Sequence, residues 1–74
     1  MNYFLLVADG ACSKNPGPGG YGTIVATPDE YVEEFGGGEN QTTNNRMELM
    51  GFYRGLQEIG RLSKDAPLKK IHVI

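Results

Sequence analysis

Cysteine, net charge and long apolar runs are all scarce in this sequence. Its 74 residues include one cysteine, Cys12, and one histidine, which excludes an internal disulfide and leaves no cysteine–histidine cluster for zinc. The longest apolar run, residues 3–8, follows no lysine or arginine and is too short for a signal-peptide core. With no export signal and one thiol, we expect a cytoplasmic protein in a reducing environment, with no membrane partner.

The chain is also short. Seven lysines and arginines against nine acidic residues give a net charge of −2, which argues against a basic nucleic-acid arm, though not against a local binding site. A chain of this size is a single domain or part of one, and it buries only about 60–65% of the surface that its unfolded form exposes. Its stability is marginal unless a metal or a partner contributes.

Glycine is the residue in excess, with eleven copies that lie mostly in two clusters. The clusters at residues 10–20 and 36–38 predict shaped loops. Periodicity and turn residues predict strands over residues 3–8, 21–27 and 30–35, a helix over residues 44–62 and a strand over residues 68–74. The first strand shows no polar alternation, so we expect it to be covered on both faces.

The predicted helix has an apolar face and a polar start. Apolar residues spaced by three, four and three positions predict the face that packs on the sheet; they are Leu49, Phe52, Leu56 and Ile59. Residues 43–45 are all of N-cap type, and Asn45 with Glu48 fits a loose capping box.

The order of these elements predicts an α/β fold with a mixed sheet. Its β-β-β-α-β order gives three antiparallel strands, one helix and a fourth strand parallel to the first. In that topology the helix begins, and the fourth strand ends, at the edge of the sheet where Asp9 lies. We therefore expect Asp9, the first glycine cluster, residues 42–48 and the carboxyl end of the chain to converge at a ligand site there.

Two carboxylates at this edge are candidates for chemistry. Taken alone, Asp9 could end its strand and cap the following loop, and Glu48 could serve the helix cap. Two carboxylates brought together from separate elements repel each other unless a cation or a proton lies between them. Their hard oxygen atoms favour Mg²⁺ or Mn²⁺ over zinc.

Two other stretches have alternative interpretations. Residues 17–22 (GPGGYG) formally match a dinucleotide-binding fingerprint, which we reject because a strand and not a helix follows the glycines. Residues 41–46 (QTTNNR) offer neutral donors and acceptors at a helix start, suited to a phosphate or a sugar hydroxyl, whereas capping alone needs one or two of them.

Two long motifs resemble a known family. Residues 9–22 (DGACSKNPGPGGYG), followed by residues 42–50 (TTNNRMELM), are similar to the amino-terminal half of a type 1 ribonuclease H. The resemblance covers essentially the whole chain, so residues 1–74 are interpreted as the amino-terminal part of a single ribonuclease H-like domain. The fold that it implies agrees with the element order above.

The resemblance implies hydrolysis of the RNA strand of an RNA–DNA hybrid with two divalent ions, Mg²⁺ or Mn²⁺. By this match Asp9 and Glu48 are the catalytic residues and metal ligands, with a further backbone contact from Gly10. Hybrid-binding residues of the family fall, by the same match, at Gly10, Cys12, Asn15, Thr43, Asn44 and Asn45. Contacts to 2′-hydroxyls would distinguish RNA from DNA, and Thr43 falls where the family holds a DNA-strand phosphate.

One departure from the family pattern affects the predicted activity. After its fourth strand the family continues with a Thr-Asp-Ser motif whose aspartate is a third metal ligand, and the present sequence stops at Ile74, before that motif. Asp29 and Asp65 are expected at the opposite end of the sheet, which leaves Glu39 as the internal carboxylate near the right edge. We therefore expect the isolated chain to be inactive.

Three hypotheses follow from this pattern. The first is a ribonuclease H fragment or subunit that needs a second polypeptide for its missing carboxylates. The second is a non-catalytic hybrid-binding or interaction module, and the third is a truncated product without a function of its own. Because one helix covers only one face of a sheet, we also expect a homodimer or a complex with a complementary carboxyl-terminal fragment.

Overall fold

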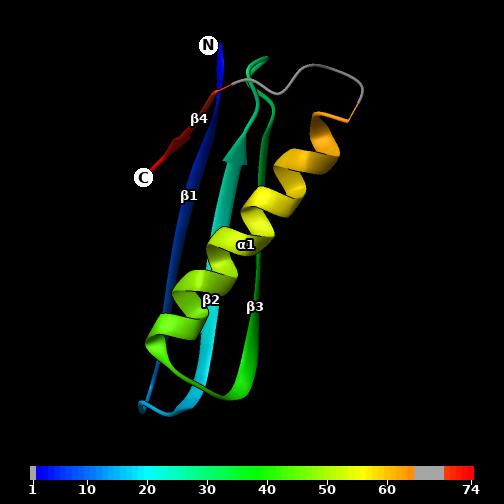
Figure 1. The fold of residues 1–74 in the computed structure, drawn as a ribbon. Coiled ribbons are helices and arrows are strands. Elements are labelled where there is room, and N and C mark those ends of the chain that lie inside the picture. The colour runs from blue at the N-terminus through cyan, green and yellow to red at the C-terminus, as the bar shows by residue number, and fades with distance from the viewer. Residues whose placement is uncertain (1, 65–69) are drawn as a thin grey trace.

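The fold is a twisted four-stranded sheet with a long helix packed against it, as seen in a computed structural model that describes residues 2–64 and 70–74. Its elements follow one another along the chain as β1 (Tyr3–Cys12), β2 (Gly17–Ala26), β3 (Val32–Thr42), α1 (Asn44–Leu62) and β4 (Lys70–Val73) (Figure 1). The expected β-β-β-α-β order is confirmed, and the bounds of the helix agree with its predicted range.

The pairing of the strands is also as expected. The spatial order is β3-β2-β1-β4; β1 pairs antiparallel with β2, β2 pairs antiparallel with β3, and β4 lies parallel to β1. The long hairpins keep β1 to β3 side by side along their whole length (Figure 1). A helical crossover from β3 then brings β4 to the far side of β1, which is the usual route to a parallel neighbour.

The glycine clusters lie mostly in strands, so the predicted loop over residues 10–20 was too long and the predicted loop over residues 36–38 was wrong. Residues 13–16 separate β1 from β2, and β3 continues through residues 36–38 to Thr42. The two clusters face each other in the sheet, where Gly20 pairs with Gly38 and Gly22 pairs with Gly36. Their backbones therefore find hydrogen-bond partners in each other's strands, which local propensity alone does not reveal.

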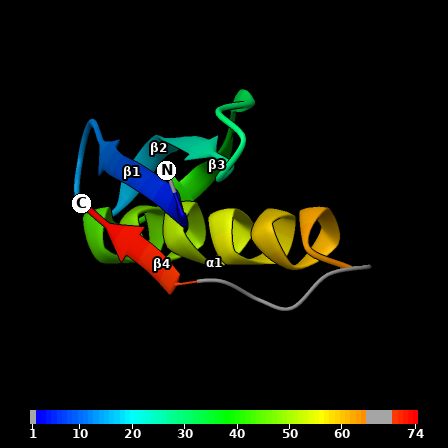
Figure 2. The same cartoon turned by 90° about the horizontal axis from the view of Figure 1, so that it is seen from above.

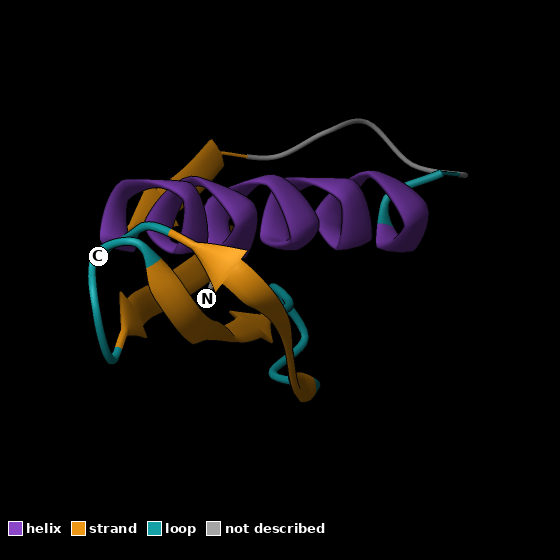
Figure 3. Cartoon of the chain, turned by 90° about the horizontal axis from the view of Figure 1, so that it is seen from below, coloured by secondary structure: helices purple, strands orange, loops and turns teal. Residues whose placement is uncertain are grey.

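Helix α1 lies along one face of β1, β2 and β3 (Figures 2 and 3). Between the helix and the sheet, Phe4, Leu6, Val25 and Ile59 form a buried hydrophobic cluster. From Tyr3 to Val7 the residues of β1 alternate between half-buried and buried positions. The expectation that the first strand is covered on both faces is therefore wrong for the described part of the chain, where α1 packs on one face alone.

The face of α1 that meets the sheet differs from the predicted one. Its buried residues are Met47, Gly51, Gly55 and Ile59, so of the predicted face only Ile59 is fully buried. Phe52 is half-buried, whereas Leu49 and Leu56 are 69% and 49% exposed. The helix approaches so closely at its glycines that Thr23 donates a hydrogen bond to the Gly51 carbonyl at 2.9 Å. Hydrophobic periodicity overlooked this face because glycine carries no apolar side chain to count.

Strand β4 is short and pairs with the first part of β1 only. Its register runs from Tyr3 opposite Lys70 to Leu6 opposite Val73, and the Ile74 amide donates to the Leu6 carbonyl at 2.9 Å. The predicted start of this strand, residues 68 and 69, lies outside the described residues. In the described residues, no helix has the length and apolar character that crossing a membrane requires.

Candidate functional site

Asp9 lies inside β1 and does not end it. It pairs with Gly22 of β2, and the strand continues for three more residues to Cys12. The predicted role as a strand-terminating cap is therefore wrong. Its Oδ1 accepts a hydrogen bond from the Gly10 amide at 3.0 Å, and the residue is exposed. A solvent-facing carboxylate is thus held on a regular strand, at a point that β4 does not reach.

Gly10 places this part of β1 directly against the start of α1. A Cβ atom at Gly10 would lie 2.7 Å from the Glu48 amide nitrogen and 2.7 Å from the Met47 Cβ. Such contacts are far inside van der Waals distance, so only glycine allows the strand and the helix to approach this closely. The close approach places Gly10, the residue after Asp9, against the backbone of Met47 and Glu48.

Glu48 takes no part in the helix cap. Thr43 is the N-cap residue, and its hydroxyl accepts a hydrogen bond from the Arg46 amide at 3.2 Å. The predicted capping box of Asn45 with Glu48 is therefore wrong, because Asn45 is already within the first turn of α1. The side chain of Glu48 is exposed in the second turn of the helix.

Three of the predicted binding residues form one hydrogen-bonded cluster. The Asn44 side chain accepts from the Cys12 amide at 2.7 Å, and Asn15 Oδ1 accepts from the Asn44 amide at 3.3 Å. The Cys12 thiol lies 3.7 Å from the same Asn15 oxygen and 3.1 Å from the Lys14 carbonyl. These contacts join the loop between β1 and β2 to the start of α1, and all of the cluster's side chains remain at least partly open to solvent.

The predicted convergence at this edge is therefore partial. Asp9, residues 10–15 and residues 43–48 come together, but the carboxyl end does not, because Ile74 hydrogen-bonds to Leu6. Asp9 lies three residues further along β1, or roughly 10 Å at the rise of an extended strand. The strand residues Val7, Ala8 and Asp9 therefore lie beyond the part of β1 that pairs with β4.

Among the described residues, a third carboxylate does not join the site. In the part of the chain that the structure describes, no group of three or more His, Cys, Asp or Glu residues could hold a metal ion together. Glu39 pairs with Arg46 at 3.3 Å, and Asp29 accepts a hydrogen bond from Thr27 in the turn after β2. Asp65, the remaining internal candidate, lies outside the described residues.

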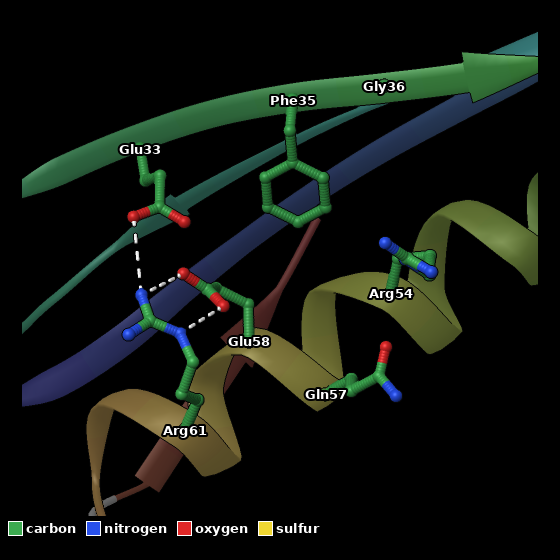
Figure 4. A pocket seen from close by; sticks show the side chains of 7 residues that line it. All are labelled: Glu33, Phe35, Gly36, Arg54, Gln57, Glu58 and Arg61. Atoms are coloured by element: carbon green, nitrogen blue, oxygen red, sulfur yellow. Dashed lines mark hydrogen bonds and ion pairs between the residues drawn. The ribbon is translucent and has the colours of Figure 1, made fainter.

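A separate charged cluster of Glu33, Glu58 and Arg61 lies between β3 and the second half of α1. Together with Phe35, Gly36, Arg54 and Gln57, these residues line an open pocket of about 360 Å³. Figure 4 shows Arg61 held between two carboxylates, with its Nη2 2.5 Å from Glu58 and 3.8 Å from Glu33. The hydrogen bonds from Arg61 lower the pKa of Glu58 to about 2, and the proximity of Glu58 raises the pKa of Glu33.

Sequence reasoning missed the contacts that unite distant segments. Cys12 and Asn44 are 32 positions apart, and nothing in either local pattern predicts that one amide bonds the other side chain. The pairing of Arg61 with Glu58 follows from their spacing of three on a helix, but the approach of Glu33 from β3 does not. Glycine at position 10, like Gly51 and Gly55, is a local sign of close packing against another element.

The fold defines the class to which this chain belongs. LC11-RNase H1, solved in complex with an RNA/DNA hybrid, matches with a TM-score of 0.82 over 95% of this chain and 51% of its own, at 24% sequence identity. The amino-terminal RNase H domain of a Mycobacterium tuberculosis protein matches with a TM-score of 0.74 and 36% identity, over 84% of this chain and 46% of its own. The architecture is therefore that of ribonuclease H-like proteins.

Sequence comparison then identifies the family. The RNase H family profile matches residues 1–73, and the chain belongs to the RNase H family. The ribonuclease H of Rhodospirillum rubrum is 57% identical over 56 residues, which are 76% of this chain and 33% of that protein. The ribonuclease HI of Synechocystis is 50% identical over 58 residues, 78% of this chain and 36% of that protein. The chain thus matches about a third of these relatives' length, and the resemblance inferred from its motifs is confirmed.

Proposed function

We propose that this chain carries part of the active site of a ribonuclease H that cleaves the RNA strand of RNA–DNA hybrids. The observation that carries the proposal is the close approach of Gly10 to the Glu48 backbone, which puts Asp9 and Glu48 at one open edge of the sheet. Membership of the RNase H family supports the activity, as does the solved relative in complex with an RNA/DNA hybrid.

The two carboxylates suit a magnesium ion better than a softer metal. Both are exposed, both offer hard oxygen atoms, and Mg²⁺ is commonly held by one or two carboxylates while it keeps several waters or substrate phosphates. Asp9 and Glu48 would hold the ion, with Gly10 contributing its backbone. When bound, Mg²⁺ or Mn²⁺ supplies an activated water and stabilises the charge on the phosphate.

The hydrogen-bonded cluster would hold the hybrid. Cys12, Asn15 and Asn44 are joined by hydrogen bonds, Gly10 lies two residues before Cys12 in β1, and Thr43 and Asn45 flank Asn44 at the start of α1. Amide side chains can donate to and accept from 2′-hydroxyls and base edges in a minor groove. Because the Asn15 side chain accepts from the Asn44 amide and the Asn44 side chain accepts from the Cys12 amide, the NH₂ groups of both asparagines would be oriented before the substrate arrives.

A second polypeptide segment would complete the metal site. Extending the observed register of Leu6 with Val73 pairs Val7 with Ile74, and Asp9 with a position two residues further on. A segment that continues β4 alongside Val7, Ala8 and Asp9 would therefore bring its second residue beside Asp9. An aspartate there would add the third carboxylate that the described residues lack.

The test is cleavage of a labelled RNA–DNA duplex in Mg²⁺ or Mn²⁺. The 74-residue chain alone is expected to show none, and the chain with the carboxyl-terminal remainder of the Rhodospirillum rubrum ribonuclease H is expected to cut the RNA strand. Cleavage by the chain alone would contradict the need for a second polypeptide. Failure of the mixture to cleave, with both parts shown to associate, would contradict the enzymatic proposal.

The alternative is a module that binds the hybrid without cleaving it. The observation in its favour is that the described residues bring together two carboxylates and not three. It predicts a shift of labelled duplex in a binding assay and no cleavage with or without the added segment. The presence of both Asp9 and Glu48 favours the enzyme, because a pure binding surface has no use for two acidic groups beside a phosphate backbone.

A further inference from the structure

Strand β3 is the outer strand of the sheet on the side away from β4. In the order β3-β2-β1-β4 it pairs with β2 alone among the described residues, so one backbone edge of its 11 residues is unpaired. Helix α1 packs chiefly on β1 and β2 and does not cover this edge. An unpaired edge of this length is a template on which a further strand can form.

The register of the hairpin identifies the backbone groups that point outward. The Thr27 amide donates to the Tyr31 carbonyl at 2.8 Å, and β2 and β3 pair in step from there to Gly38. In an antiparallel ladder every second residue bonds to the neighbouring strand, and the residues between direct their amide and carbonyl groups away from it. The outward groups belong to Val32, Glu34, Gly36 and Gly38. All four residues are exposed, and the two glycines carry no side chain to shield their backbone.

The edge is also acidic. Strand β3 contains three glutamates and no lysine or arginine. Glu33 shares the Arg61 guanidinium with Glu58, since Nη2 lies 3.8 Å from Glu33 and 2.5 Å from Glu58. Glu34 lies on the opposite face of the strand and forms no ion pair with a described residue. Each face of β3 therefore carries a carboxylate that a further cation would compensate.

The open pocket of about 360 Å³ lies between this edge and α1. Figure 4 shows Arg54 on the far side of the Phe35 ring from Glu33. A strand added to β3 would direct every second side chain to the face where this pocket lies. A lysine or arginine would be attracted at the Glu33 end, whereas Arg54 would repel a cation at the other end. The charges thus favour one placement of a basic side chain.

We propose that the outer edge of β3, residues 32–38, binds an extended basic segment of a partner protein, which pairs with β3 as an added strand and places a lysine or arginine beside Glu33. Backbone hydrogen bonds supply affinity in this mode of recognition, and the side chains select the partner. A second copy of this chain is disfavoured, because two β3 strands would bring six glutamates to one seam. The proposal uses none of the candidate site residues and is independent of hybrid cleavage.

The test titrates a fluorescent peptide against the 74-residue chain and follows its anisotropy. The probe is a seven-residue peptide with blocked ends, in which two adjacent lysines precede alternating valine and threonine. The lysine pair can lie opposite Glu33 and Glu34, one on each face of the strand. A peptide with glutamates in place of the lysines should bind about tenfold or more weakly, because two attractive cross-strand pairs become repulsive. A peptide with proline at its centre should also bind more weakly, because proline cannot donate to the ladder.

Variants of the chain test the same contacts from the other side. The double variant Glu33→Gln, Glu34→Gln should weaken binding of the lysine peptide about threefold or more. The matched control is Asp9→Asn, Glu48→Gln, which removes two charges from positions outside β3 and should bind like the unmodified chain. Equal affinity of the two double variants overturns the proposal.

Hydrogen exchange measured by NMR distinguishes strand addition from simple charge attraction. With the lysine peptide at ten times its Kd, the outward amides of Glu34, Gly36 and Gly38 should exchange about tenfold more slowly. The amides of Phe35 and Gly37 already bond to β2 by the register above and should change less. Absence of slowing at the three outward amides overturns the proposal.

Three further outcomes would also overturn it. The lysine peptide could fail to bind, or the glutamate or proline peptide could bind as tightly as the lysine peptide. Exchange at the outward amides could also slow with rising chain concentration in the absence of peptide, which would make a second copy the occupant.

Discussion

Gly10 determines how closely the two carboxylate-bearing elements approach each other. Its neighbours are backbone atoms of Met47 and Glu48, which cannot move aside as the end of a flexible side chain could. Any larger residue would push the start of α1 away from β1. The candidate site thus depends on the absence of a side chain as much as on the presence of Asp9 and Glu48.

Substituting Gly10→Ala should therefore lower the free energy of unfolding by about 1–3 kcal/mol, the range for inserting an atom into a well-packed contact. Chemical denaturation followed by circular dichroism measures the change. Gly22→Ala is the matched control, because a Cβ there meets nothing within 4 Å. Equal stability of the two variants would mean that the strand and the helix are less closely packed than the structure indicates.

Asp9→Asn should abolish cleavage by the completed enzyme and leave hybrid binding largely intact, because the amide keeps the shape of the side chain but loses the charge that holds Mg²⁺. A labelled duplex, followed by gel for cleavage and by anisotropy for binding, separates the two effects. Asp29→Asn removes the same charge at the turn after β2 and should leave both unchanged. Retained cleavage in Asp9→Asn would remove this residue from the metal site.

At the scale of elements, the glycines of α1 set the distance between the helix and the sheet. A Cβ at Gly55 would lie 3.0 Å from Thr23 Cγ2 and would collide with the fully buried Leu6 side chain, whereas a Cβ at Gly60 would meet nothing within 4 Å. The two positions share one helix and differ in what faces them. They separate the intrinsic effect of glycine on helix stability from its effect on packing.

Gly60→Ala should raise the free energy of unfolding by about 0.5–1 kcal/mol, because alanine favours the helix. Gly55→Ala gains the same helix propensity but overpacks the interface, at a cost of about 1–3 kcal/mol, so its net effect should be zero or destabilising. Thermal and urea unfolding of the two variants measure the difference. A stabilised Gly55→Ala variant would contradict the close approach of α1 to Leu6.

Arg61 links α1 to β3 through its ion pairs with Glu58 and Glu33. These pairs should make the free energy of unfolding depend on pH in the acidic range. Glu58 has its pKa lowered to about 2 from an ordinary value of 4.5, so its contribution is fully present above about pH 4.5 and is lost as the pH falls toward 2. The raised pKa of Glu33 acts in the opposite sense and offsets part of this loss.

Arg61→Met removes the cause of the lowered pKa of Glu58. The free energy of unfolding of the unmodified chain should therefore fall more steeply between pH 4.5 and 2 than that of Arg61→Met. Urea unfolding at several pH values measures both slopes, and Arg54→Met, in the same pocket, is the control. Parallel slopes for the unmodified chain and Arg61→Met would show that the ion pair does not persist in solution.

At the scale of the whole molecule, one helix packs on a sheet whose β1 strand is only partly paired on one side. In the described part of the chain, β4 pairs with β1 from Tyr3 to Leu6 and does not reach Asp9. A segment that continues β4 could therefore supply a further carboxylate beside Asp9.

Such a segment should stabilise the chain by mass action. If it binds the folded form alone, a free concentration of one hundred times its Kd raises the free energy of unfolding by about 2.7 kcal/mol. Thermal unfolding at increasing segment concentration measures the effect. A melting temperature independent of segment concentration would contradict this coupling.

Much of the fold could be predicted from the sequence because its signals are local. The period of the apolar residues and the N-cap types at residues 43–45 located α1 within its observed bounds. The long motifs around Asp9 and Glu48 identified the family, which the profile match over residues 1–73 confirms. The roles of the individual site residues remain predictions, since family membership does not test them one by one.

Other features were decided by tertiary structure alone. Two glycine clusters with loop-like composition are strands because each provides the other with backbone partners, and α1 packs through Gly51 and Gly55 because close approach needs small residues that hydrophobic periodicity does not count. The contact of Gly10 with Met47 and Glu48 likewise joins segments that no local pattern connects. The sequence by itself determined which elements form and which carboxylates they carry, since those depend on neighbours along the chain. Only the tertiary structure decided which faces meet, because packing depends on the shapes of residues that are distant in sequence and adjacent in space.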